Sequence, residues 1–125
     1  MNPIEFRILV AHEFPQLRDD LEYWEDDLPH LQMGEFLQFT QKAIEARLFD
    51  VVRRSFEVAA IALKSGDDQL LNAIYVAFLE DLDFRSSAGK DAFPLMPTGL
   101  KKGRYEILDY DEKLLGRKLE VDDRA

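Results

Sequence analysis

The chain has 125 residues, with a hydrophobic content of 46 % and a charged content of 33 %, which is typical of one globular domain with a strongly charged surface. It contains no cysteine, so disulfides, thiolate zinc sites and cysteine nucleophiles are excluded. Its net charge of −9 disfavours binding to nucleic acids and to anionic membranes, because both depend on Lys and Arg.

The N-terminal segment MNPIEFRILVAHEF lacks the basic start and the unbroken apolar run of a secretory signal. The chain also lacks a window of about 18 apolar residues, so we expect no membrane span. The absence of cysteine fits a reducing compartment, and we therefore expect a cytoplasmic protein.

The first two predicted helices are marked by their prolines. Asn2 followed by Pro3 predicts a helix that begins there and runs to about His12. Pro15 predicts the start of a second helix, which Pro29 is expected to end. The apolar residues of this second helix recur at helical spacing: Leu17, Leu21, Trp24 and Leu28.

Three longer helices are predicted in the middle of the chain, at 31–46, 48–64 and 67–82. Gly66 is expected to end the second of these, and one of the two aspartates that follow it should cap the third. The helix at 67–82 is apolar around much of its circumference, so we expect it to lie at the centre of the fold.

The C-terminal third is predicted to be less regular. Residues 85–94 read as a loop, Pro97 can start a short helix that ends at Gly103, and a further helix is predicted at 105–115. Only residues 106–110 resemble a strand, and no apolar–polar alternation is sustained. The fold prediction is all-α, with five or six antiparallel packed helices in a single compact domain at 1–115 and a flexible tail at 116–125.

Catalytic and metal-binding patterns are missing from the sequence. The chain has two histidines, His12 and His30, and Pro29 interrupts the spacing between Asp27 and His30. Glu-x-x-His, EF-hand, Gly-x-Ser-x-Gly and phosphate-loop motifs do not occur. We therefore expect no cofactor, no metal and no enzymatic activity. A carboxylate enzyme that uses a divalent metal and a homo-oligomeric structural module remain alternatives, and the sequence does not determine the oligomeric state.

The strongest functional candidate is the acidic run in the second predicted helix. Residues 1–30 contain eight acidic and two basic side chains, a net charge of −6 within a total of −9. A helical wheel places Trp24 with the leucines in the core and Tyr23 among the acids. We predict that this face binds a basic protein partner such as a toxin, with Tyr23 as the anchor. The predicted partner-binding residues are Asp19, Glu22, Tyr23, Asp26 and Asp27. The alternative is a solvated helix face with no partner.

A second acidic cluster lies near the end of the helix at 67–82. Glu80, Asp81 and Asp83 occupy the helix end at which the macrodipole disfavours anions, and we expect Arg85 or Lys90 to neutralise them. The Lys- and Arg-containing segments 53–54 and 101–104 are further candidates for internal ion pairing. Segment 101–104 is too short to be a nucleic-acid patch.

The second half of the chain contains a series of short motifs: Gly66-Asp67, Asn72-Ala73-Ile74, Phe78-Leu79-Glu80, Leu95-Met96-Pro97 and Lys102-Gly103, followed by Tyr105 after an inserted Arg104. In these motifs the chain resembles an uncharacterised family of small bacterial all-helical domains, a domain of unknown function. The resemblance extends over about residues 4–110 and is distinctive after Gly66. The resemblance implies a small helical domain and no reaction or catalytic residue. In size and charge the chain is also similar to immunity and antitoxin proteins.

Overall fold

The computed structural model describes residues 1–21 and 29–115, and the prediction of an all-α fold is confirmed. Within these residues no strand occurs. The elements in chain order are α1 (Pro3–Glu13), a 3-10 turn (Pro15–Leu17), α2 (Arg18–Leu21), α3 (Pro29–Glu45), α4 (Phe49–Ser65), α5 (Asp68–Ile74), a π-helical turn (Tyr75–Leu79), α6 (Ser87–Ala92), a second 3-10 turn (Phe93–Leu95) and α7 (Thr98–Leu115).

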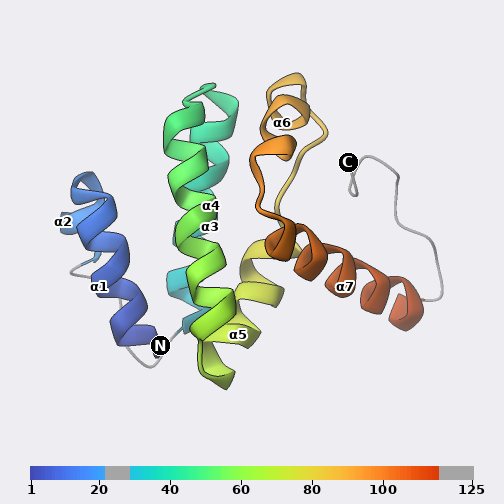
Figure 1. Cartoon of the computed structure of the whole chain (residues 1–125), viewed down its shortest axis with the longest axis horizontal. Coiled ribbons are helices and arrows are strands. Elements are labelled where there is room, and N and C mark those ends of the chain that lie inside the picture. Colours follow the sequence, from blue (N-terminus) through green and yellow to red (C-terminus); the bar gives the residue numbers. More distant parts are fainter. Residues whose placement is uncertain (22–28, 116–125) are drawn as a thin grey trace.

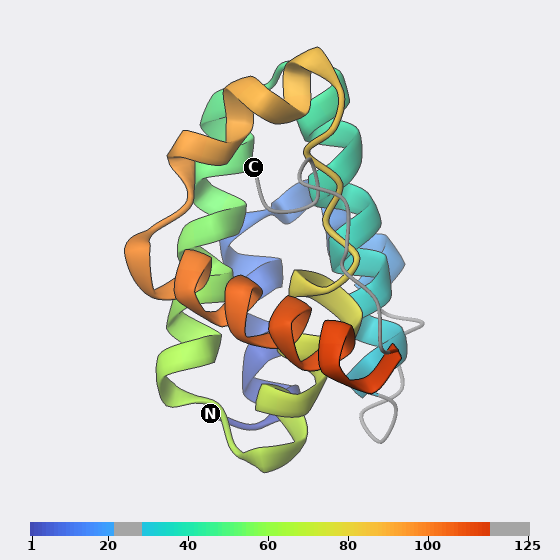
Figure 2. The same cartoon turned by 90° about the vertical axis from the view of Figure 1, so that its right-hand side faces the viewer.

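The helices are arranged around an α3–α4 hairpin (Figure 1). α1 packs antiparallel to α4, because the Met1 amino group donates to the Ser65 carbonyl at one end and Arg54 donates to the Glu13 carbonyl at the other. α5 lies below the hairpin, α6 lies near its upper end, and α7 crosses the side opposite α1 (Figures 1 and 2). The turn between α3 and α4 is tight, with Arg47 in the left-handed region at φ 58°.

The predicted caps explain where several helices begin and end. Asn2 accepts from the Glu5 N–H and Glu5 accepts in return from the Asn2 N–H, which forms a capping box at α1. Asp67 caps α5 by accepting from the Leu70 N–H at 2.9 Å. Gly66 ends α4, as expected from the sequence.

Pro29 begins α3 at Pro29–Glu45, two residues before the predicted start of that helix; the predicted end of the second helix before Pro29 lies outside the described residues. Proline is favoured in the first turn of a helix, where its missing N–H has no intrahelical partner in any case. In the predicted second helix, Leu17 packs against the core. Trp24 and Leu28 lie outside the described residues.

The prediction of a loop at 85–94 was wrong, since this segment forms α6 and the 3-10 turn after it. Ser86 caps α6 by accepting from the Gly89 N–H at 2.9 Å. Gly89 lies so close to the chain that an added Cβ would be 2.6 Å from the Phe84 Cα. A helix of six residues is too short to show a helical repeat, and close packing that only glycine permits keeps it in place.

The C-terminal helices predicted separately at 97–103 and 105–115 are one continuous helix, α7. Gly103 does not interrupt it, because this residue is buried where an added Cβ would be 3.0 Å from Leu79 and 3.3 Å from Leu63. The strand-like run at 106–110 is helical within α7. Tertiary packing against the π-helical turn and α4 therefore overrides the weak local preference.

Gly34 offers a test of the helix α3. It lies in the middle of α3, and an added Cβ would meet no atom within 4 Å. Gly34→Ala should therefore raise the free energy of unfolding by about 0.5–1 kcal/mol, because alanine restricts the unfolded chain more than glycine does. Urea denaturation measures this change. Gly89→Ala is the control and should lose stability; a loss in Gly34→Ala as well would contradict the described environment of Gly34.

Candidate functional site

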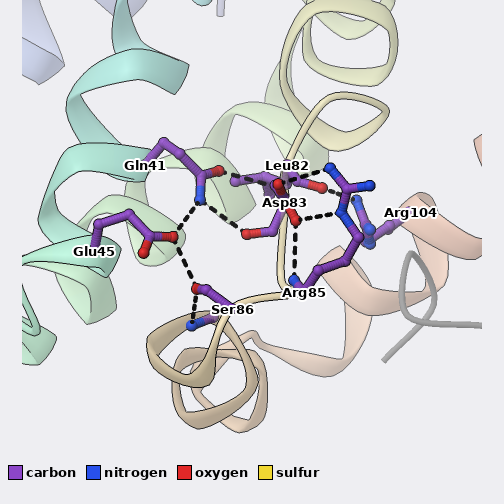
Figure 3. Close-up of polar contacts among 8 residues, drawn as sticks. Gln41, Glu45, Leu82, Asp83, Arg85, Ser86 and Arg104 are labelled. Carbon is purple, nitrogen blue, oxygen red and sulfur yellow. Dashed lines mark hydrogen bonds and ion pairs between the residues drawn. The ribbon is translucent and has the colours of Figure 1, made fainter.

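A network of polar contacts joins α3 to the chain that follows the π-helical turn (Figure 3). The Gln41 amide donates to the Asp83 carbonyl at 2.8 Å and accepts from the Asp83 N–H at 3.0 Å. Ser86 donates its hydroxyl to Glu45 at 2.9 Å while it caps α6. These polar groups are hydrogen-bonded to one another and hold residues 82–86 against α3. The role of the network is therefore structural.

Arg104 is fully buried, which is rare for arginine and was not expected from the sequence. One Nη atom donates to the Leu79 carbonyl at 2.7 Å and to the Leu82 carbonyl at 2.9 Å. The guanidinium also lies 5.0 Å from the centre of the Phe84 ring. Arg104 thus caps the carbonyls at the end of the π-helical turn and fastens α7 to it.

The expected neutralisation of the second acidic cluster is confirmed in part. Arg85 donates to Asp83 through Nε and Nη2, both at 3.0 Å, and these hydrogen bonds lower the pKa of Asp83. Arg104 contributes to the same effect through its charge. Glu80 instead contacts an acid, Asp111 of α7.

Among the described residues, Glu80 has a strongly shifted pKa. Burial, the hydrogen bond with Asp111 and the negative charges of Asp111 and Asp81 raise its pKa from 4.5 to about 7. Nearby, the Tyr75 hydroxyl donates to Glu106 at 3.5 Å, and burial followed by the Glu106 charge raises the pKa of Tyr75. Two side chains of the π-helical region thus face carboxylates of α7.

The C-terminal part of α7 combines negative charge with exposed apolar side chains, and we call residues 106–115 the acidic end of α7. It contains Glu106, Asp109, Asp111, Glu112 and Lys113, a net charge of −3 from four acids and one base. Tyr110 is 59 % exposed and Leu114 is 69 % exposed. Tyr110 stands between two aspartates, which repeats the chemistry predicted for Tyr23.

A shallow pocket of about 410 Å³ lies where α3 and α5 begin, lined by Pro29, His30, Asp68, Gln69 and Asn72. His30 Nε2 lies 3.2 Å from the Asn72 side-chain nitrogen, so His30 is in contact with an amide. The pocket contains one imidazole and one carboxylate, which is a weak basis for a catalytic or metal site.

Most of the predicted partner-binding residues lie outside the described part of the chain. Asp19 is exposed on α2, whereas Glu22, Tyr23, Asp26 and Asp27 fall in residues 22–28. Sequence reasoning did not identify the acidic end of α7. Its signal was present in DYDEK, where a tyrosine lies among acids as it does in EYWEDD, but the segment was interpreted only as a weak helix or strand.

Across residues 1–21 and 29–115, no group of three or more His, Asp or Glu side chains is arranged to bind a metal. No helix in the same residues is both long and apolar enough to cross a membrane.

A protein-family model described as "Domain of unknown function (DUF7674)" matches residues 7–113 of the chain. The chain matches no curated protein and no solved structure.

Proposed function

The chain belongs to the DUF7674 family, and since a domain of unknown function supplies no activity, we propose from its surface that it is a non-enzymatic module that binds a basic protein partner. The observation that carries this proposal is the exposure of Tyr110 and Leu114 on the acidic end of α7. The alternative is that this helix end faces only water.

One side of α7 is apolar both where the helix is packed and beyond that part. The residues that follow one another at helical spacing along this side are Gly103, Ile107, Tyr110 and Leu114. Gly103 is buried and Ile107 packs against the core, whereas Tyr110 and Leu114 are exposed. A partner helix or groove can extend this packing, because residues at such spacing are the anchors of helix-in-groove recognition.

The charge around these side chains determines the kind of partner. The acidic end of α7 has a net charge of −3. Its Asp111 contacts Glu80, and the next residue after Glu80, the exposed Asp81, adds a further negative charge nearby. Such a field attracts Lys- and Arg-rich surfaces and accelerates their association. Tyrosine is enriched at the energetic centres of interfaces, which assigns Tyr110 the role of anchor.

We further propose a bacterial immunity- or antitoxin-like role in the cytoplasm, in which the protein masks a basic surface of a toxin. The total charge of −9 supports this role. The predicted face at Asp19, Glu22, Tyr23, Asp26 and Asp27 has the same combination of tyrosine and acids, and it is a second proposed contact with the same partner.

The binding proposal can be tested with the partner purified from the native host with the tagged full-length protein. Tyr110→Ala should raise the Kd for that partner at least about tenfold, because a buried aromatic anchor is removed. Titration calorimetry at two salt concentrations measures the change. The association should weaken as salt is raised, since charge attraction is screened.

Leu48→Ala and Ile61→Ala are matched controls, because both side chains are exposed and apolar but do not belong to the acidic end of α7. They should leave the Kd unchanged. Tyr23→Ala and Asp26→Lys test the second face in the same assay. A Kd that stays unchanged in Tyr110→Ala would exclude the acidic end of α7 as the binding surface, whatever the outcome for Tyr23.

A further inference from the structure

The first half of α7 lies in the basic part of an otherwise acidic chain. Residues 84–105 contain five basic side chains and one acidic one, a net charge of +4 within a total of −9. In α7 itself, Arg104 is buried, Lys101 is half-buried and Lys102 is exposed. Within the described part of the chain, Lys102 forms no ion pair. Residues 98–105, the basic half of α7, therefore present positive charge to solvent.

The basic half and the acidic end of α7 share one exposed side of the helix. Lys102, Glu106 and Asp109 follow one another at helical spacing, and all three are exposed. No other described helix lies over this side, because α7 is the outermost helix opposite α1 (Figures 1 and 2). Positive and negative charge thus lie next to each other along one uncovered surface.

The two ends of this surface cannot neutralise each other within one molecule. The seven residues from Lys102 to Asp109 span about 10 Å along the helix axis, which exceeds the reach of side-chain pairs three or four residues apart. α7 is continuous and cannot fold back on itself. The attraction between its basic half and its acidic end is therefore available to another molecule.

We propose that a second copy of this chain docks on α7, with the two α7 helices antiparallel and Lys102 of each copy facing Asp109 of the other. A two-fold axis between Tyr105 and Glu106 forms this charge pair twice, so the contact is closed and ends at a dimer. In this register, Tyr110 of each copy lies over the first turn of the other α7. Gly99 is exposed in that turn, and an added Cβ there would meet no atom within 4 Å, which leaves room for the tyrosine ring.

The dimer goes beyond the proposed function and does not depend on it. Both contacts cover Tyr110, so a basic protein partner would have to displace the second copy. A contact along one helix is smaller than a standard protein interface, and we therefore expect a weak dimer. Because its pairs are exposed charges, it should weaken further as salt is raised.

Sedimentation equilibrium of the full-length protein, alone and in low salt, tests the dimer. The mass should rise from monomer to dimer with concentration and go no higher. In the same samples, the amide NMR signals of residues 99–113 should shift on dilution, whereas those of α1 should stay in place. This second measurement requires no variant to fold.

Charge reversal tests the register. Lys102→Glu and Asp109→Lys should each weaken self-association at least about tenfold, because each places two like-charged pairs across the two-fold axis. An equimolar mixture of the two variants should form a dimer again, since both pairs then have opposite charges. Both changes in one chain should restore self-association for the same reason. Lys64→Glu, an exposed charge reversal on α4, is the matched control and should leave the dimer unchanged.

A wild-type protein that stays monomeric at every concentration in low salt would overturn the dimer, and so would a mixture of the two variants that stays monomeric. Neither experiment involves the basic protein partner. A monomer whose partner binding is weakened by Tyr110→Ala would retain the proposed function alone. A dimer whose partner Kd is unchanged by Tyr110→Ala would retain self-association alone.

Discussion

Phe36→Ala should lower the free energy of unfolding by about 3–5 kcal/mol, because it removes the ring at the centre of the core. The Phe36 ring lies 5.6 Å from that of Phe6, 6.2 Å from that of Phe14 and 5.4 Å from that of Phe78. These rings belong to α1, to the turn after α1 and to the π-helical turn, so Phe36 of α3 joins distant segments of the chain. Chemical denaturation monitored by circular dichroism measures the loss.

Two variants make this result specific. Phe36→Leu retains most of the apolar volume and should cost much less than the alanine change. Leu114→Ala removes a side chain that is 69 % exposed and should change stability by no more than about 0.5 kcal/mol. A similar small loss in Phe36→Ala would mean that the three segments are not joined through this ring.

Arg104→Ala should also cost about 3–5 kcal/mol, for a different reason. The Leu79 and Leu82 carbonyls would lose their donor in a buried setting, and the space left by a fully buried arginine would remain. Thermal and urea unfolding measure the effect. We also expect the spectrum of Phe84 to change, because the guanidinium lies against its ring.

Lys101→Ala is the matched control in α7. It removes a positive charge three residues away, and the Lys101 ammonium lies 4.9 Å from the Phe93 ring in a half-buried position. Such a contact contributes about 1 kcal/mol or less. Equal losses in the two variants would show that Arg104 acts through its charge on the helix and not as a cap of the π-helical turn.

The well-predicted parts of the fold are those with local physical causes. Asn2-Pro3 and Asp67 determine where α1 and α5 begin, because they satisfy N–H groups that have no partner inside the helix. The long apolar stripes of α3 and α4 were evident from the helical spacing of their apolar residues. Their bounds, Pro29–Glu45 and Phe49–Ser65, differ from the predicted ones by at most two residues.

The missed parts depend on contacts between segments that are distant in sequence. α6 exists because Gly89 packs on the Phe84 backbone, and α7 is continuous because Gly103 packs on Leu79. Neither contact is visible in a local pattern, in which a glycine indicates only a break. The sequence grouped Arg104 with Lys101 and Lys102 as a basic segment, although only the fold determines that Arg104 is buried.

For the candidate site, the sequence prediction fell mostly on residues 22–28, which lie outside the described part of the chain. It singled out a tyrosine among acids at 19–27, and the structure describes the same combination at Tyr110. It also marked Glu80 as an acid at an unfavourable helix end, but assigned it a basic neighbour. The contact with Asp111 joins residues 31 positions apart, so no local rule could predict it.

The π-helical turn has a consequence for how the family can vary in length. The Glu80 N–H reaches the Tyr75 carbonyl, five residues back, at 3.0 Å, where a regular α-helix would reach four. The π-helical turn therefore contains one residue more than an α-helical turn. The side chains of Phe78, Leu79 and Leu82 are buried nonetheless. A family member one codon shorter between positions 75 and 79 could form a plain α-helix here. Such a deletion in α3 or α4 would instead rotate half of a core stripe into water.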